Sequence, residues 1–277
     1  MKIALTGGTG FLGRHILRSL VKRNLAVRVI VRNMGGLDPA VLDYPNVDLV
    51  EVRDIFYEPH NNLKDLLASC DTLIHAAWYT NSSDYQSSQE NIRCLKGSIA
   101  LATAFADAGG SRMIGIGTCS EYMTSNELTT VNTPLQPSTL YAACKASTFY
   151  TLTELSKLLN ISFSWCRLFY LFGEGQQSNK LIPTLHYRLP RGMEVELTLG
   201  HQVRDWLEVQ TAADIIVTRA LSGKEGPFNV CSGIGVSVRD ISLAVAESYG
   251  RGDLLLFGAR PENPFDPEFI VAEKIEP

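Results

Sequence analysis

Short apolar runs and segments of helical periodicity alternate along the first 170 residues of the chain. The apolar runs predict strands at residues 2–6, 27–31, 47–52, 72–75, 113–116 and 162–168. The spacing of apolar positions predicts one helix that starts at Phe11 and two more at residues 85–108 and 141–159. Strands that alternate with helices in this way form βαβ units with right-handed crossovers. The pattern therefore predicts an α/β fold built on a parallel sheet.

The hydrophobic pattern becomes mixed after Gly173. Helical periodicity returns at residues 180–191, 211–221 and 238–249, and short strands separate these segments. We therefore expect a chain in two parts. Residues 1–170 form the α/β domain, and residues 171–277 form mostly a smaller C-terminal lobe, with some segments returning to the sheet.

A glycine-rich loop joins the first predicted strand to the first predicted helix. In Gly7, Gly10 and Gly13 the chain has the spacing G-x-x-G-x-x-G. In this context the first glycine permits a tight turn, the second lets the backbone approach a pyrophosphate, and the third allows close helix–strand packing. The helix N-terminus offers free N–H groups to an anion. The loop predicts a Rossmann-like, doubly wound parallel sheet that binds a dinucleotide, and a glycine turn without a ligand is the alternative. The other expected contacts in the loop are Thr9, Phe11 and Leu12.

Two arginines decide which dinucleotide is expected. An acidic residue at the end of the second strand would accept the hydroxyls of the adenosine ribose, as in NAD-binding proteins. This chain has Arg32 there, and Arg14 follows the last loop glycine. Two guanidinium groups suit a 2′-phosphate, so NADP(H) is favoured. The alternative is NAD, with Arg32 stacked on adenine and Arg14 solvated. Further expected cofactor contacts are Asp54 and Ile55 near the adenine, and Ala76 and Ala77 after the fourth strand.

Tyr141 and Lys145 are the candidate acid–base pair. They lie at i and i+4 of a predicted helix and therefore share a face. An ammonium beside a phenol stabilises the phenolate and lowers its pKa, so that the phenol can exchange a proton with a carbonyl or an alcohol. Lys145 can also bond the nicotinamide ribose, and Thr118 can hydrogen-bond the same substrate oxygen as Tyr141. The alternative is a Tyr141 that serves only as an amphipathic helix residue.

Composition narrows the class of function. The 277 residues are 45% hydrophobic and 19% charged, which is enough apolar sequence for a full core. The net charge of −4 gives no excess of positive charge for binding nucleic acid or an anionic membrane. No apolar run reaches membrane-spanning length, and we expect no signal peptide. The six cysteines, at positions 70, 94, 119, 144, 166 and 231, have no C-x-x-C spacing. We therefore expect reduced thiols, no metal site, a cytoplasmic location and a small-molecule substrate.

In combination, these motifs resemble the extended branch of the short-chain dehydrogenase/reductase superfamily, which comprises nucleotide-sugar epimerases, dehydratases and reductases. The resemblance spans nearly the whole chain. Its motifs are the opening loop at residues 6–13, the fourth-strand stretch at 71–77, Asn91, and the stretch at 118–122. The resemblance implies that Thr118, Tyr141 and Lys145 form a catalytic triad.

The resemblance also implies contacts in the second half of the chain. Residues 167–173 resemble the segment that runs under the nicotinamide toward the sugar, so Phe169 is an expected cofactor contact and Tyr170 an expected substrate contact. Many relatives have asparagine where this chain has Tyr170. Residues 200–206 resemble the stretch whose arginine grips the nucleotide diphosphate, and Arg204 has the planar fork that suits a pyrophosphate. A structural salt bridge is the alternative for Arg204. The expected partner is a nucleotide-diphosphate sugar.

One departure bears on the reaction. Relatives that dehydrate the sugar carry an acidic pair, or at least a glutamate, just after the catalytic threonine, because elimination needs an extra acid and base. This chain has Cys119 and Ser120 there, and Glu121 comes one place later. Dehydration is therefore disfavoured, although a one-residue slip would place Glu121 inside the site. We expect Cys119 to be a packed thiol rather than a nucleophile.

The leading hypothesis is an NADPH-dependent reductase of a nucleotide-linked 4-keto-6-deoxysugar. A net reductase exchanges its cofactor in each cycle, and cellular reductions usually draw on NADPH, so Arg14 and Arg32 favour reduction. The first alternative is an NAD-dependent nucleotide-sugar 4-epimerase. The others are a reductase of a non-nucleotide ketone or aldehyde, and a protein that binds NADP without turnover.

The resemblance further implies a homodimer. In the family, the helix that carries the tyrosine and lysine packs with its neighbour across a dimer axis into a four-helix bundle. Apolar residues of the helix at 85–108 provide a matching face, unless they are buried against the sheet. These residues are Ile92, Leu95, Ile99 and Ala102.

Overall fold

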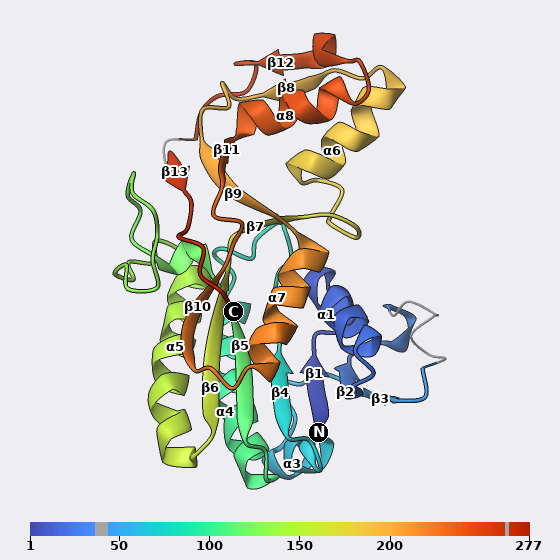
Figure 1. Ribbon diagram of the computed structural model, residues 1–277, viewed down its shortest axis with the longest axis vertical. Coiled ribbons are helices and arrows are strands. Elements are labelled where there is room, and N and C mark those ends of the chain that lie inside the picture. Colours follow the sequence, from blue (N-terminus) through green and yellow to red (C-terminus); the bar gives the residue numbers. More distant parts are fainter. Residues whose placement is uncertain (37–43, 264–265) are drawn as a thin grey trace.

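The structure of the protein is a computed structural model that describes residues 1–36, 44–263 and 266–277 (Figure 1). Its centre is a seven-stranded sheet in the order β10-β6-β5-β4-β1-β2-β3, in which all neighbouring strands are parallel. The strands are β1 (Lys2–Thr6), β2 (Ala26–Val31), β3 (Val47–Glu51), β4 (Thr72–His75), β5 (Arg112–Thr118), β6 (Ser162–Leu168) and β10 (Gly226–Val230). This order, with β1 near the middle, confirms the predicted Rossmann-like, doubly wound sheet.

Helices cover both faces of the sheet. On one face lie α1 (Phe11–Lys22) and α7 (Val209–Leu221), and on the other lie α3 (His60–Leu67), α4 (Glu90–Asp107) and α5 (Leu140–Leu159). The alternation of side chains along β1 shows why. Ile3 and Leu5 join the core under α1 and α7, whereas Ala4 joins the core under α3, α4 and α5. Both faces are therefore buried, as a parallel sheet requires.

A smaller lobe stands above the carboxyl ends of the sheet strands (Figure 1). It contains α6 (Leu181–Arg188), α8 (Val238–Glu247) and a two-stranded sheet of β8 (Val195–Leu197) and β12 (Leu255–Phe257). A four-stranded sheet joins this lobe to the body. Its strands are β7 (Tyr170–Phe172), β9 (Val203–Glu208), β11 (Gly235–Ser237) and β13 (Phe269–Ile270). Short 3-10 turns are η1 (Met34–Gly36), η2 (Cys119–Glu121), η3 (Leu189–Arg191) and η4 (Gly252–Leu254).

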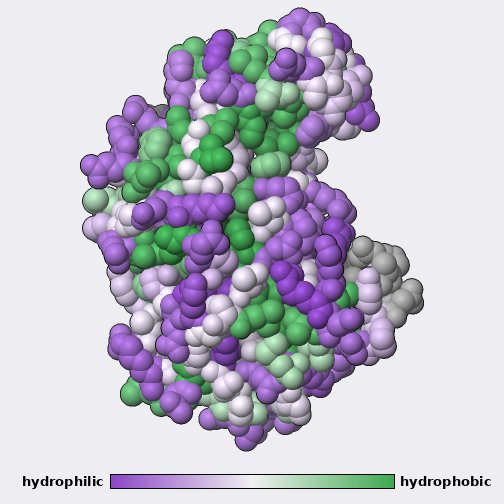
Figure 2. Space-filling view, in the orientation of Figure 1, coloured by the Kyte–Doolittle hydropathy of each residue, from purple (hydrophilic) through white to green (hydrophobic). Residues whose placement is uncertain are grey.

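Two segments of the C-terminal part return to the body. α7 packs on α1, and β10 extends the large sheet beside β6. In Figure 2 the molecule narrows where the lobe meets the body, and hydrophobic residues gather on the visible surface beside that narrowing. The lobe stands over the carboxyl ends of the strands, the edge of such sheets where ligands bind (Figure 1).

The element boundaries differ from those expected in a few places. The helix predicted at residues 85–108 begins only at Glu90, because the Asn91 side chain donates hydrogen bonds to the carbonyl oxygens of Tyr85 and Ser88 and holds a turn there. The helix predicted at 180–191 ends as α6 at Arg188 and continues as η3. α3 was not predicted, and the short strands between the C-terminal helices were predicted without bounds, since their hydrophobic periodicity is weak.

No helix of the described residues is long and apolar enough to cross a membrane. All six cysteines are buried and free. Within the described ranges, no three His, Cys, Asp or Glu side chains form a group that could hold a metal ion.

Candidate active site

The glycine loop has the geometry that its spacing predicts. Gly7 has a φ of +75°, and a Cβ there would lie 2.7 Å from the backbone nitrogen of Ala77. The Gly10 N–H donates to the Gly7 carbonyl oxygen over 3.0 Å, which closes the turn. A Cβ at Gly13 would overlap that same carbonyl oxygen, so only glycine lets α1 pack this close to the strand. A Cβ at Gly10 would meet only one atom within 4 Å, so this backbone faces open space.

The residues around this loop fit a phosphate-bearing ligand. The first N–H groups of α1 point out of the helix without intrahelical partners. Arg14 donates from Nη2 to the Thr9 carbonyl oxygen over 3.2 Å, and its Nε is buried without a hydrogen-bond partner. A buried guanidinium nitrogen with no acceptor is costly, and an anionic ligand in the loop would satisfy it. Arg14 also lies against Gly175, whose Cβ would come 2.9 Å from the Arg14 Nη1.

The adenosine end of the expected site is less complete. Arg32 is exposed just after β2, as its predicted role requires. Asp54 is already engaged: it lies 3.2 Å from Arg93 in an ion pair and accepts a hydrogen bond from the backbone N–H of Phe56. Ile55 is buried in the core beneath it. The Asp54 carboxylate therefore already holds α4 to this loop, and the predicted contact with adenine would have to use the same carboxylate.

Ala76 and Ala77 continue from β4 across the top of β1. Their backbone N–H groups donate to the carbonyl oxygen and to the hydroxyl of Thr6, respectively. The close approach of Ala77 to Gly7 leaves no room for a larger side chain on the loop glycine. These two residues therefore shape the floor of the glycine loop.

Thr118 ends β5 and begins η2. Its hydroxyl accepts from the Ser120 N–H, and its own N–H donates to the Glu121 carboxylate over 2.8 Å, which forms a reciprocal capping box. The cap fixes the Thr118 side chain at the carboxyl edge of the sheet. The predicted hydroxyl is therefore held in place by the turn that follows it.

Tyr141 lies in the first turn of α5, a helix capped by the Thr139 side chain. The Tyr141 ring is half-buried and stands edge-on to the ring of Tyr85, with 5.0 Å between the centroids. Burial raises the pKa of the Tyr141 phenol above its ordinary value, Tyr85 and Glu121 act in the same direction, and a hydrogen bond with Thr118 lowers it. Tyr141 and Thr118 are thus brought together as predicted.

Lys145 lies one turn further along α5 and is buried. Its Nζ donates to the Ile116 carbonyl oxygen over 2.6 Å and lies 3.7 Å above the ring centroid of Trp78. Burial lowers the pKa of Lys145 to about 7, and Glu121 and Cys94 oppose that shift. At neutral pH this amine is therefore poised between its two protonation states.

The expected effect of Lys145 on the Tyr141 phenol is not found in this structure. We predicted a lowered phenol pKa, whereas burial raises it, and Lys145 is not among the groups that shift it. The reason is geometric: the ammonium is directed at the Ile116 carbonyl and at Trp78. The three residues of the predicted triad lie close together, but the raised pKa keeps the phenol protonated at neutral pH.

Glu121 does not enter the site. Its carboxylate is fully buried and receives hydrogen bonds from Arg167 Nε over 2.7 Å and from the indole N–H of Trp165 over 3.0 Å. Burial raises the pKa of Glu121, and the adjacent Arg167 offsets much of this effect. The one-residue slip that would bring Glu121 to the substrate is thus ruled out by its hydrogen bonds.

Cys119 and Ser120 fill the two positions after Thr118. Cys119 is buried in a small cluster with Tyr122 and Phe169, and burial raises the pKa of its thiol to about 12. A thiol in that state is a poor nucleophile, which agrees with its predicted role as a packed side chain. Ser120 is exposed.

The expected substrate side is formed by the sheet that joins lobe and body. Arg204 is buried, and its Nη2 donates to Asp266 over 2.7 Å while its guanidinium lies 5.2 Å from the Tyr170 ring centroid. In this structure Arg204 therefore makes a structural salt bridge, which was the alternative to the predicted contact with a nucleotide diphosphate. The Tyr170 ring packs on Trp206, and Phe169 is buried below it.

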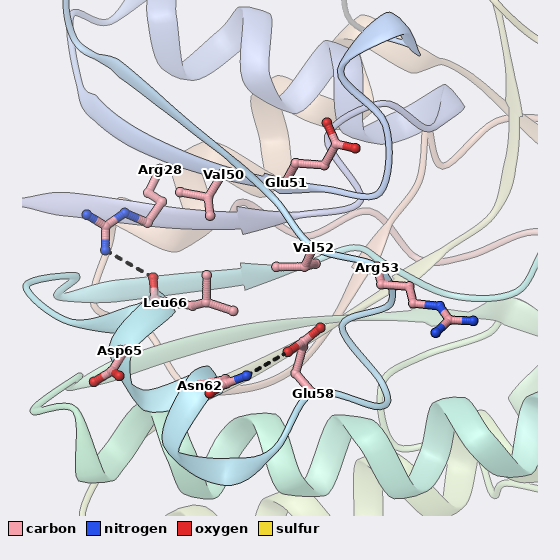
Figure 3. A pocket seen from close by; sticks show the side chains of 9 residues that line it. All are labelled: Arg28, Val50, Glu51, Val52, Arg53, Glu58, Asn62, Asp65 and Leu66. Carbon is pink, nitrogen blue, oxygen red and sulfur yellow. Dashed lines mark hydrogen bonds between the residues drawn. The ribbon is translucent and has the colours of Figure 1, made fainter.

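A separate groove of about 560 Å³ lies at the far edge of the large sheet (Figure 3). It is lined by residues of β2, β3, the loop after β3, and α3: Arg28, Val50, Glu51, Val52, Arg53, Glu58, Asn62, Asp65 and Leu66. β4, β1 and β2 separate β3 from β5, which carries Thr118. This groove contains none of the predicted site residues.

Two aromatic residues of the site were not predicted. Trp78 packs on Lys145, and Tyr85 packs on Tyr141. Both come soon after β4, at the edge of the sheet where ligands bind. That position was the signal available in the sequence, since a run of aromatic and polar residues follows the apolar strand there.

Comparison with known proteins identifies the family. The model of the NAD-dependent epimerase/dehydratase family matches residues 3–231. The chain is 24% identical over 244 residues to dTDP-6-deoxy-L-talose 4-dehydrogenase (NAD(+)) of Aggregatibacter actinomycetemcomitans, covering 86% of this chain and 87% of that protein.

Solved structures show the same fold at low identity. The UDP-N-acetylglucosamine 4-epimerase of Methanobrevibacter ruminantium, in complex with UDP-N-acetylmuramic acid, superposes with a TM-score of 0.88 at 21% identity, over 98% of this chain and 89% of that one. A double mutant of the dTDP-glucose 4,6-dehydratase of Streptomyces venezuelae, with NAD bound, gives 0.86 at 22% identity, over 99% and 88%. With the glycine loop, the strand order and the Thr118–Tyr141–Lys145 group in place, the chain belongs to the NAD-dependent epimerase/dehydratase family, within the extended short-chain dehydrogenases/reductases, and is a nicotinamide-dependent enzyme of that type.

Proposed function

We propose that the protein is a cytoplasmic, NADPH-dependent reductase of a nucleotide-linked 4-keto-6-deoxysugar. The observation that carries this proposal is the state of the groups next to Thr118. Glu121, the carboxyl group nearest to Thr118 in sequence, is locked to Arg167, and the Cys119 thiol has a raised pKa. The proposed site thus offers hydroxyl groups and an amine for carbonyl reduction, without the extra acid and base that elimination needs.

In the proposed reduction, Tyr141, Thr118 and Lys145 each have one role. A reduced nicotinamide, when bound, supplies the hydride to the ketone carbon. Tyr141, kept protonated by burial, donates its phenolic proton to the ketone oxygen. The Thr118 hydroxyl donates a hydrogen bond to that same oxygen as negative charge develops on it. Lys145, which lies one helical turn from Tyr141, holds the nicotinamide ribose.

Three features of the loop support a nicotinamide dinucleotide as the cofactor. Gly7, Gly10 and Gly13 leave the backbone open to a pyrophosphate, and α1 begins there. The unpartnered Nε of Arg14 marks a place for an anion. Phe169, Asp54, Ile55, Ala76 and Ala77 complete the proposed contacts.

The preference for NADPH over NADH rests on Arg14 and Arg32. Arg32 is exposed where an NAD-binding protein would place an acid for the ribose hydroxyls, and Arg14 follows the last loop glycine with its Nε unpartnered. The names of several relatives mention NAD, so the 2′-phosphate contact is the specific property of this chain that we propose. Arg32→Asp should lower the affinity for NADPH by 10-fold or more, roughly the loss of one charge-assisted pair, and leave that for NADH unchanged or improved.

The relatives support the position of the chemistry on the sugar. One of them is by name a 4-dehydrogenase of dTDP-6-deoxy-L-talose. Oxidation at C4 of a 6-deoxysugar is the reverse of reducing a 4-keto-6-deoxysugar, and a catalyst accelerates both directions. We therefore propose the nucleotide 4-keto-6-deoxysugars as the substrate class, with the smaller lobe holding the nucleotide.

Arg204 and Tyr170, on the sheet that joins the lobe to the body, are the proposed substrate contacts. Because Arg204 is paired with Asp266, a diphosphate that binds Arg204 must replace or share this carboxylate. Arg204→Ala should raise the KM for the sugar nucleotide about 10-fold or more, the weight of one bidentate contact, while the affinity for NADPH stays unchanged. Unaltered affinity would favour a ketone substrate that has no nucleotide.

The decisive experiment is a turnover screen with purified protein. Nucleotide 4-keto-6-deoxysugars with different bases are mixed with NADPH or NADH, and oxidation of the cofactor is followed by its absorbance. We expect NADPH to be consumed in proportion to the ketone reduced, and dTDP-glucose to be left undehydrated. Tightly bound NAD together with interconversion of UDP-sugars in the absence of NADPH would instead identify a 4-epimerase.

We also propose a homodimer formed through α4 and α5. These helices pack against each other, and Ile92 on α4 and Leu158 on α5 are exposed. Leu95, Ile99 and Ala102 of α4 lie deeper, and Ala102 is buried against the sheet core. Leu158→Glu should shift the mass measured by light scattering from two chains to one.

A further inference from the structure

Lys145 has an uncommon set of neighbours for a buried amine. Its Nζ lies 3.7 Å from the Trp78 ring centroid and 5.7 Å from that of Trp165, and it donates to the Ile116 carbonyl oxygen. Within residues 1–36, 44–263 and 266–277, Lys145 makes no ion pair. The face of an indole therefore stands where a carboxylate would usually compensate a buried cation.

Trp78 is itself held in one orientation. Its indole N–H donates to the Asn91 side-chain oxygen over 2.8 Å, and Asn91 is fully buried. The Asn91 amide nitrogen in turn donates to the carbonyl oxygens of Tyr85 and Ser88. Asn91 therefore links the ring that faces Lys145 to the turn whose Tyr85 packs on Tyr141.

We infer that Trp78 is a positioning residue of this enzyme: its indole face, fixed by Asn91, keeps the Lys145 ammonium charged and held beside the Ile116 carbonyl. The ring takes up one side of the ammonium, and the Ile116 carbonyl takes one N–H. A lysine has three N–H donors, so one is left for a ligand. Part of this inference, the need for a charged Lys145 in turnover, rests on the proposed function.

The groups around Lys145 show why its contact with the Trp78 ring affects its ionisation. Glu121 on η2 and Cys94 on α4 are the groups that favour the charged lysine, and His75 on β4 is a buried neighbour. Desolvation outweighs them and lowers the pKa of Lys145 to about 7. A cation–π contact at a desolvated site opposes this by an amount equivalent to about one pKa unit. Loss of the ring should therefore lower the charged fraction of Lys145 at neutral pH.

Nuclear magnetic resonance on the full chain, without cofactor or substrate, tests the contact directly. The chain is labelled with carbon-13 in its nine lysines, and Lys145→Met identifies the Lys145 signal by its disappearance. In the unmodified protein we expect the ε-methylene protons of Lys145 to be shifted upfield by the indole ring current. Trp78→Leu should abolish that shift and lower the pKa of Lys145 by about one unit.

Matched variants make the result specific. Trp78→Phe keeps an aromatic face without the indole N–H, so part of the upfield shift should remain. Trp206→Leu makes the same change in another half-buried indole, one that donates to Val236, and should leave the Lys145 signal unchanged. Should leucine at position 78 prevent folding, Trp78→Met removes the ring with a flexible side chain of closer volume.

The outcomes are separable from those of the proposed function. An ordinary Lys145 signal in the unmodified protein, or one unaffected by loss of the Trp78 ring, would overturn the inference whatever the substrate is. The second readout is the pH at which kcat/KM changes with Lys145 ionisation, which should fall by the same one unit in Trp78→Leu. A shifted signal with an unshifted pH profile would keep Trp78 as the positioning residue and remove Lys145 from the proposed reaction.

Discussion

Tyr141, Lys145 and Glu121 show how burial decides the state of single residues in this site. The phenol of Tyr141 has a raised pKa, and the amine of Lys145 has a lowered one, so burial moves both toward their uncharged forms. Glu121 keeps a partner in Arg167 and stays in the core. The proposed acid is thus a neutral phenol that gives up its proton only to a developing alkoxide.

Removal of the Tyr141 hydroxyl tests this role. Tyr141→Phe should lower kcat by roughly 10²- to 10⁴-fold, the usual contribution of a general acid, while the Kd for NADPH stays unchanged. Steady-state kinetics and a fluorescence titration measure the two quantities. Tyr150→Phe, on the exposed side of the same helix, is the matched control. A Tyr141→Phe enzyme with full kcat would assign the proton donor elsewhere.

His75 carries the second prediction at this scale. It is buried, with Nδ1 2.7 Å from the Thr6 hydroxyl and Nε2 2.9 Å from the Ser98 hydroxyl. Ser98 donates its own proton to the Cys94 carbonyl, so Nε2 carries the hydrogen and Nδ1 accepts from Thr6. Burial, followed by the nearby Lys145, lowers the pKa of His75 to about 3.

The sign of the pH dependence follows from that shift. Above an ordinary pKa near 6.5 both folded and unfolded chains have a neutral His75. Between about 6.5 and 3 only the unfolded chain binds the proton, so stability falls as the pH falls through this window, by up to roughly 1.4 kcal/mol per pH unit. Urea unfolding at a series of pH values measures this slope. His75→Gln should flatten it, and an equal slope in that variant would contradict the assignment.

At the scale of elements, the glycine loop and α1 are held by contacts between backbones. Gly13→Ala forces a Cβ into the Gly7 carbonyl oxygen, and overpacking of this kind costs about 1–3 kcal/mol or more. Urea denaturation should show the loss of stability, and a titration should show weaker NADPH binding. Gly252→Ala is the control, because a Cβ there meets no atom within 4 Å. Equal stability of the two variants would refute the close packing.

The elements also show which parts of the fold a sequence can predict. The inner strands of the large sheet are buried on both faces and therefore appear as apolar runs. The predicted strands β1 to β6 and the glycine loop were found in place. The turn at Tyr85 to Gln89 was missed because a single side chain, Asn91, holds it, and hydrophobic periodicity does not record such a bond. β7, β9 and β13 form by pairing segments far apart in the chain.

In the candidate site, too, local spacing decides the position of some residues and long-range contacts decide that of others. Thr118, Tyr141 and the loop glycines depend on short-range spacing, and the structure brings them to one edge of the sheet. The position of Glu121 depends on its hydrogen bond with Arg167, which lies 46 residues away in the chain. The sequence alone therefore left the position of Glu121 open. The pairing of Arg204 with Asp266 over 62 residues is a further example. Long-range partners decide whether a charged group is free to react.

At the scale of the whole molecule, Asp205 joins the lobe to the body. This fully buried carboxylate on β9 accepts hydrogen bonds from Ser232 N and Oγ, both 2.7 Å away, from Gly233 N at 3.0 Å, and from Ala272 N at 3.3 Å. One side chain therefore ties β9 to the turn after β10 and to the C-terminal segment.

Removal of that carboxylate should loosen the junction. Asp205→Ala leaves several buried donors unsatisfied and should cost about 3–5 kcal/mol in the free energy of unfolding. Thermal unfolding measures the cost, and limited proteolysis should show faster cleavage near residue 272. Asp253→Ala, which removes an exposed partner of Arg251, is expected to change neither. A junction that resists protease in Asp205→Ala would show that other contacts suffice.

The six buried cysteines have a practical consequence. Burial raises the pKa of every one of these thiols, so none supplies a reactive thiolate to the solvent while the chain is folded. A thiol-labelling reagent can therefore react only with molecules that have opened. Since the thiols lie in α4, α5, β6 and η2, just before β4 and just after β10, the order in which they are labelled reports which layer opens first. The protein carries its own set of unfolding probes, with no engineered label required.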